Sequence, residues 1–136
     1  MKIKLIAFFL LFGLNIFYAQ YSIVVNIKNI SSTKGNIQVA LYNTEKNFLK
    51  KPYKSLKGFI HHNTSQVIFK NIPKGIYAIS LYHDENANQK IDLGLFGIPK
   101  EPYGCSNGAK GFMGPPKFDD AQFVLNQNKQ LVIYLN

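Results

Sequence analysis

The chain has 136 residues and a formal net charge of +9, from 16 basic and seven acidic residues. Every basic residue is a lysine, which argues against nucleic-acid binding, because bidentate recognition of bases and phosphates favours arginine. The single cysteine, Cys105, excludes an intrachain disulfide, and the length suits one domain with a hydrophobic core.

Residues 1–19 have the layout of a secretory signal peptide, with a basic start, a short apolar run and a small residue, Ala19, at the expected cleavage point. The apolar run is too short to predict a membrane span, and no later segment is apolar enough to cross a bilayer. No cysteine follows Ala19 to carry a lipid anchor. We therefore expect an exported protein, periplasmic or extracellular, with a single domain over residues 20–136.

Alternating apolar and polar residues predict β-strands along most of this domain. The polar segment 43–57 predicts a loop or a helical turn instead. The expected strands are 21–28, 37–41, the hairpin 58–62 and 66–70, 76–82, 121–126 and 130–135. Six to seven strands with almost no helix predict an all-β fold, an antiparallel β-sandwich of about seven strands.

One long connection, residues 83–120, separates two of these strands. Loops longer than about 12–15 residues are usually functional or disordered. This one is rich in large apolar side chains, so we expect it to be ordered by packing on the sandwich. The aromatic residues expected to pack there are Phe96, Tyr103, Phe112 and Phe118.

The loop begins with H-D-E-N-A-N-Q-K-I-D, which spaces oxygen-bearing residues as a calcium loop does. The candidate metal ligands are Asp84, Asn86, Asn88, the carbonyl group of Lys90, and Asp92. An EF-hand is excluded, because Gln89 replaces its turn glycine and Leu95 replaces its bidentate glutamate. A weak calcium site would need a further carboxylate, from Glu85, Glu101, Asp119 or Asp120. The alternative is that these side chains only make turn hydrogen bonds.

Catalysis by the same loop is a second interpretation. A nucleophilic pair of Cys105 and His83 is unspecific as a pattern, because a lone cysteine is more often a buried apolar residue. A hydrolase or transferase that uses His83, Glu101 and Asp120 stays open.

The second half of the loop, F-G-I-P-K-E-P-Y-G-C-S-N-G-A-K-G, lacks the context of a phosphate-binding loop. Ser106 and Asn107 lie in it and are possible binding residues. A third interpretation is a sugar- or peptide-binding groove that presents Tyr103, Phe112 and Phe118.

Three segments of the chain together resemble the exported bacterial proteins grouped as domain of unknown function 2141. They are H-D-E-N-A-N-Q-K-I-D, F-G-I-P-K-E-P-Y-G-C-S-N and G-P-P-K-F-D-D-A. The segment F-K-N-I-P-K-G-I-Y-A-I-S is also similar to a hairpin of transthyretin-like and carboxypeptidase-regulatory sandwiches. The resemblance implies an exported β-sandwich without an established activity. The family motif falls on His83, Asp84, Asn86, Asn88, Asp92, Gly97, Pro99, Glu101, Gly104, Ser106, Asn107, Pro116, Phe118, Asp119 and Ala121.

This chain departs from the family pattern at Ala87 and Gln89, where the family loop usually has glycine. Since glycine most easily adopts positive φ, we expect the tight turn of a cation loop to be weakened here. The leading hypothesis is a non-enzymatic binding or accessory module at the cell envelope, with an unidentified ligand and a loop that calcium stabilises.

Overall fold

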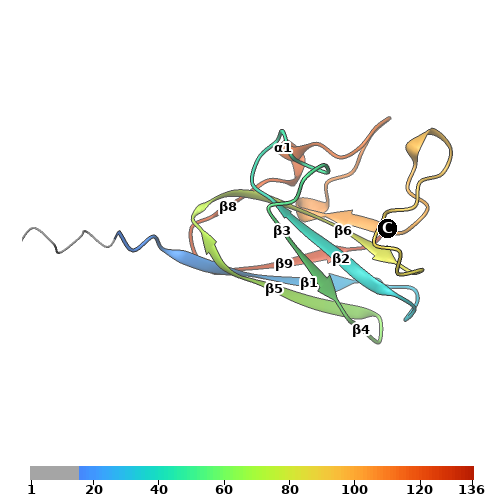
Figure 1. The fold of residues 1–136 in the computed structure, drawn as a ribbon, viewed down its shortest axis with the longest axis horizontal. Helices are drawn as coiled ribbons and strands as arrows, with labels where there is room; N and C mark the ends of the chain where they lie inside the picture. Colours follow the sequence, from blue (N-terminus) through green and yellow to red (C-terminus); the bar gives the residue numbers. More distant parts are fainter. Residues whose placement is uncertain (1–15) are drawn as a thin grey trace, which may run out of the picture.

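The computed structural model describes residues 16–136, so that residues 1–15 of the expected signal peptide lie outside the described residues. Nine strands form two sheets that face each other (Figure 1). No helix in residues 16–136 is both long enough and apolar enough to cross a membrane.

The first sheet has the strand order β4-β5-β1-β9, and the second has the order β3-β2-β6-β7, with β8 also paired to β6. The strands of the first sheet are β1 (Gln20–Lys28), β4 (Ile60–His61), β5 (Thr64–Pro73) and β9 (Lys129–Tyr134). Those of the second are β2 (Asn36–Tyr42), β3 (Lys54–Gly58), β6 (Gly75–Asp84), β7 (Tyr103–Cys105) and β8 (Phe123–Leu125).

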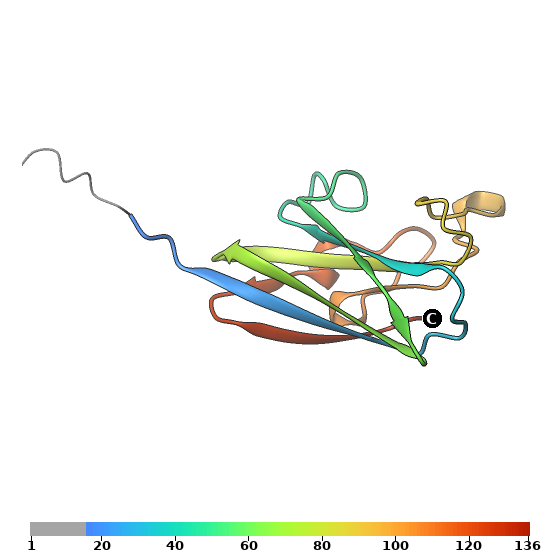
Figure 2. The same ribbon diagram turned by 60° about the horizontal axis from the view of Figure 1, so that its bottom comes forward.

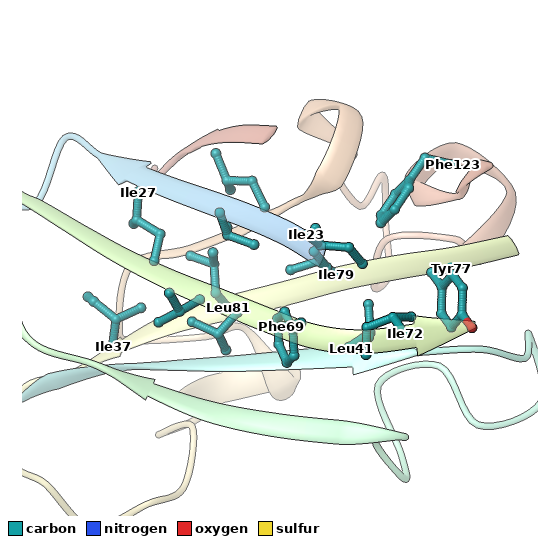
Figure 3. Packing of buried hydrophobic residues seen from close by; sticks show 14 of the residues in the cluster. Ile23, Ile27, Ile37, Leu41, Phe69, Ile72, Tyr77, Ile79, Leu81 and Phe123 are labelled. Carbon is teal, nitrogen blue, oxygen red and sulfur yellow. The ribbon is translucent and has the colours of Figure 1, made fainter. Parts of the chain in front are cut away.

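Alternation along the strands places the main core between the two layers, which Figure 2 shows nearly edge-on. Ile23, Ile27 and Phe69 of the first sheet meet Leu41 and Ile79 of the second (Figure 3). A smaller apolar cluster lies on the other face of the second sheet. It consists of Tyr42, Phe48, Ala78, Cys105, Ala109, Phe118 and Ala121.

The β-sandwich prediction is confirmed, but two details of it were wrong: that segment 43–57 contains no strand, and that all pairing is antiparallel. Segment 43–57 contains most of the edge strand β3, which pairs antiparallel with β2. The two C-terminal strands lie in different sheets, because β8 joins the second sheet while β9 crosses to the first. There β9 pairs in parallel with β1, so the sandwich is not wholly antiparallel.

The connection 83–120 is folded rather than a single loop. It contains β7, two short 3-10 turns (η2, Leu95–Gly97, and η3, Ser106–Gly108) and the start of helix α1 (Phe118–Ala121). Strand β7 continues the second sheet beside β6. It divides the connection into a first part at the end of β6 and a second part on the outer face of the sheet.

Candidate functional site

The candidate site begins where β6 ends, at two fully buried residues, His83 and Asp84. Both contact the turn that precedes β2. The His83 Nε2 atom lies 2.7 Å from the Lys34 carbonyl oxygen and donates to it. Gly35 follows with φ of +69°, and a Cβ atom there would lie 1.9 Å from the Asp84 carbonyl oxygen. Only glycine fits this contact, which fixes the start of the loop.

The Asp84–Asp92 loop is organised by side-chain oxygens that accept backbone N–H groups. The Asp84 carboxylate accepts from Asn88 at 3.1 Å and from Gln89 at 2.9 Å. The Asn86 side chain accepts from Asn88 at 3.2 Å, and the Asn88 side chain accepts from Lys90 at 3.0 Å. Alternate side chains along the loop therefore make turn hydrogen bonds, as the alternative interpretation of the spacing predicts.

The two positions that lack glycine nevertheless take the left-handed conformation. Ala87 has φ of 55° and Gln89 has φ of 61°. The absence of glycine at these two positions therefore does not prevent the backbone from forming the tight turn, contrary to the expectation. The cost is strain, about 1–2 kcal/mol for each non-glycine residue in this region.

Asp92 closes the loop and links it to Glu101. Its two carboxylate oxygens accept from the side-chain amides of Asn86 at 2.7 Å and Asn88 at 2.9 Å. Its backbone N–H donates to Glu101 Oε2 at 3.0 Å. Glu101 is 91% buried, and its other oxygen, Oε1, has no hydrogen-bond partner. An orphaned carboxylate oxygen in this position is costly, because burial disfavours an unpaired charge.

The pKa of Tyr82 is affected by its burial and by the acidic groups near it. Burial is the main cause that raises its pKa to about 12, and three nearby carboxylates add to the rise. Those carboxylates are, in order of effect, Asp84, Glu101 and Asp92. Still, among residues 16–136 no three histidine, cysteine or acidic side chains are already spaced to hold a metal ion. The carboxylate oxygens of Asp92 instead accept hydrogen bonds from the side-chain amides of Asn86 and Asn88.

The other acidic candidates lie in different places. The carboxylate of Glu85 is partly exposed and lies 3.7 Å from His83 Nδ1, a buried atom without a hydrogen-bond partner. Asp119 and Asp120 are exposed on α1, which is fastened to the outer face of the second sheet. The described contacts include no hydrogen bond or ion pair that brings either of them to the Asp84–Asp92 loop.

Cys105 and His83 are not brought together. Cys105 is paired with Ser80 and belongs to the outer apolar cluster, whereas His83 shares the inner face of β6 with Ile79 and Leu81. Burial raises the pKa of the Cys105 thiol to about 12, which keeps it protonated at neutral pH. This arrangement does not support a Cys–His nucleophile.

Ser106 and Asn107 tie the second half of the connection to the sheet. The buried Ser106 hydroxyl accepts from the Ile79 N–H at 3.0 Å and donates to the Ala121 carbonyl at 2.5 Å. The Asn107 amide donates to the carbonyl groups of Asp120 at 3.2 Å and Gln122 at 2.7 Å. Both side chains are thus engaged in holding η3 and α1 in place.

A family model described as an uncharacterized protein conserved in bacteria, DUF2141, matches residues 25–133. The chain belongs to the DUF2141 family. Neither the curated proteins nor the solved structures contain a match to it. The family match covers the whole connection 83–120, so the motif residues named above lie within the matched region.

In this DUF2141 chain, the four aromatic residues that were expected to pack on the sandwich have different environments. Phe118 is buried against Phe48, with ring centroids 5.7 Å apart, and Tyr103 is half-buried. Phe112 is 91% exposed and Phe96 is 98% exposed, so the expectation that both pack on the sandwich was wrong.

An open groove of about 1530 Å³ lies over the outer face of the second sheet of the DUF2141 fold. Tyr82, Tyr103 and Cys105 contribute to its wall from β6 and β7, and segments 45–52, 89–99 and 111–119 border it.

The sequence did not predict that Tyr82, the Lys34 carbonyl and Gly35 belong to the candidate site. For the last two, residues 31–35 (S-S-T-K-G) have the composition of a turn, but that composition does not predict what the turn contacts.

Proposed function

We propose that this protein is an exported, non-enzymatic binding or accessory module whose Asp84–Asp92 loop is stabilised by calcium. The observation that carries the proposal is the orphaned Oε1 atom of Glu101, buried beside a loop of inward-turned oxygens. A hard cation would supply the missing partner, because calcium accepts carboxylate, amide and carbonyl oxygens in irregular geometry.

The donor chemistry fits calcium. The side-chain oxygens of Asp84, Asn86 and Asn88 each accept backbone N–H groups and keep lone-pair capacity for a cation. Asp92, Glu101 and the Lys90 carbonyl would complete the set. Binding would draw Asp92 away from the asparagine amides, so part of the binding energy is spent on rearrangement.

This cost and the small number of carboxylates favour weak binding, in the range of about 10⁻⁴–10⁻³ M that extracellular calcium modules use. Export to a compartment with abundant calcium suits that affinity. The separation of Cys105 from His83, which lie on opposite faces of the second sheet, supports a role without catalysis.

The test is calcium titration by calorimetry of a chain that begins at Gln20, with the melting temperature followed in calcium and in chelator. At a calcium concentration ten times Kd, stabilisation should be about 1.4 kcal/mol. For a domain of this size the melting temperature should rise by about 3–8 °C. Absence of both heat and shift at millimolar calcium would contradict the proposal.

Glu101→Gln separates the calcium site from simple loop damage. In chelator this variant should be at least as stable as the parent, because it removes a buried unpaired charge. In calcium it should gain no stability and release no heat of binding. Asp119→Asn is the matched control, since it removes an exposed carboxylate outside the loop and should leave calcium binding unchanged. Calcium stabilisation that survives Glu101→Gln would remove Glu101 from the site.

A further inference from the structure

Two segments of the connection 83–120 share one local design. The first reads Gly94-Leu95-Phe96-Gly97 and the second reads Gly111-Phe112-Met113-Gly114, each with two large apolar residues between glycines. We call these two segments the apolar tips. Their side chains are among the most exposed in residues 16–136: Leu95 82%, Phe96 98%, Phe112 91% and Met113 96%.

The backbone of the tips favours this exposure. The second apolar residue of each tip has positive φ, 60° at Phe96 and 53° at Met113. Such a conformation is rare for bulky residues and costs free energy. The tips thus carry both backbone strain and exposed apolar surface, and none of their residues belongs to either apolar cluster of the fold. Contiguous exposed apolar residues of this kind mark interaction surfaces.

Both tips lie on one side of the molecule. Phe96 and Gly97 of the first tip and Met113 and Gly114 of the second border the same groove. In Figure 1 the loops that carry them both lie beyond the second sheet, at the upper right of the view. A single flat apolar phase could therefore receive both tips together.

Lysines bracket each tip. Lys90 and Lys100 flank the first, and Lys110 and Lys117 flank the second, and all four are exposed. The only acidic residue between the members of either pair is Asp92, which is half-buried and hydrogen-bonded to Asn86 and Asn88. Cations at the base of an apolar projection match anionic head groups above an acyl layer, since lysine stems reach along apolar surface to place the ammonium in water.

We propose that the apolar tips insert into the surface of a bilayer that contains anionic phospholipid. Phe96, Phe112 and their neighbours enter the boundary between head groups and acyl chains, and the four lysines contact lipid phosphates. Leu95 and Phe112 do not line the groove, and Phe96 and Met113 at its border are over 90% exposed, so a bilayer suits the tips better than a small ligand held inside the groove. The proposal does not depend on calcium.

The experiment is vesicle flotation of a chain that begins at Gln20, which contains every strand of the fold. Vesicles of equal parts phosphatidylglycerol and phosphatidylcholine are compared with vesicles of phosphatidylcholine alone. Chelator is present throughout, so that calcium cannot bridge protein and lipid. We expect binding to the anionic vesicles and much weaker binding to the neutral ones.

Variants on the exposed surface identify the binding face without disturbing the fold. The double variant Phe96→Ser with Phe112→Ser should lower the partition coefficient at least roughly tenfold, as expected for removing two buried aromatic rings. Phe59→Ser is the matched control, because Phe59 is 76% exposed outside the tips. Replacing Lys100 and Lys117 by glutamine should weaken binding about fivefold per lysine, and the same change at Lys28 and Lys70 should weaken it less.

Three results would overturn the proposal. These are no binding to anionic vesicles, equal binding to both kinds of vesicle, or equal loss of binding in the Phe59→Ser control and the tip variant. The first of these would point to a protein partner for the tips instead of a bilayer.

Discussion

Ser106 shows how one hydroxyl connects distant parts of this chain. It is fully buried, and it joins the backbone of β6 at Ile79 to the end of α1 at Ala121. Sequence reasoning had placed it among possible binding residues. Its position instead gives it a structural task, because a buried N–H group and a buried carbonyl group both depend on it.

Ser106→Ala should lower the free energy of unfolding by about 1–3 kcal/mol, since it leaves these two backbone groups without partners. Urea unfolding followed by circular dichroism measures this. Ser55→Ala, at an exposed position of β3, is the control and should change stability by less than about 0.5 kcal/mol. Equal stability of the two variants would show that the Ser106 hydroxyl is not needed.

At the scale of elements, the Asp84–Asp92 loop keeps the shape of a cation loop without its glycines. The Asp and Asn side chains impose the turns by accepting backbone N–H groups, and the chain tolerates the strain at Ala87 and Gln89. Hydrogen bonds within the loop thus replace the conformational freedom that glycine would provide.

Gln89→Gly should therefore stabilise the fold by about 0.5–1 kcal/mol, the difference between relieved strain and the larger entropy of glycine in the unfolded chain. Gln130→Gly, in the extended backbone of β9, should destabilise by a similar amount. Thermal unfolding in chelator measures both variants. If both destabilise, the left-handed conformation of Gln89 costs less than proposed.

At the scale of the whole molecule, the last strand holds the two sheets together. Strand β9 lies beside β1 in parallel, the Leu135 N–H donates to the Lys28 carbonyl, and the Asn136 N–H donates to the Tyr103 carbonyl of the second sheet. The C-terminal residues thereby connect the first sheet to β7 and, through it, to the connection 83–120.

Leu135→Ala should lower the free energy of unfolding by about 2–5 kcal/mol, because Leu135 is 1% exposed and belongs to the main core. The adjacent Tyr134→Ala, at a residue 58% exposed, should cost less than about 1 kcal/mol. Chemical unfolding of the two variants tests this contrast. A similar loss in both would show that β9 contributes through its backbone rather than through this side chain.

Local spacing was enough to predict the features that depend on a few neighbouring residues. Period-two alternation predicted the strands, and on β6 it places Tyr77, Ile79 and Leu81 on one face, because neighbouring residues of a strand point to opposite faces. The spacing of Asp84, Asn86 and Asn88 predicted a turn whose side-chain oxygens accept backbone N–H groups. These features follow from backbone geometry over a few residues.

The tertiary structure alone decided which groups meet. Alternation indicates the face of a strand but not its partner, so the crossing of β9 to β1 could not be read from it. The burial of Glu101 depends on the path of the chain from Asp92 back to β7, and the exposure of Phe96 and Phe112 depends on where the rest of the chain lies around them. Each of these is set by contacts between residues far apart in sequence, which local patterns do not contain.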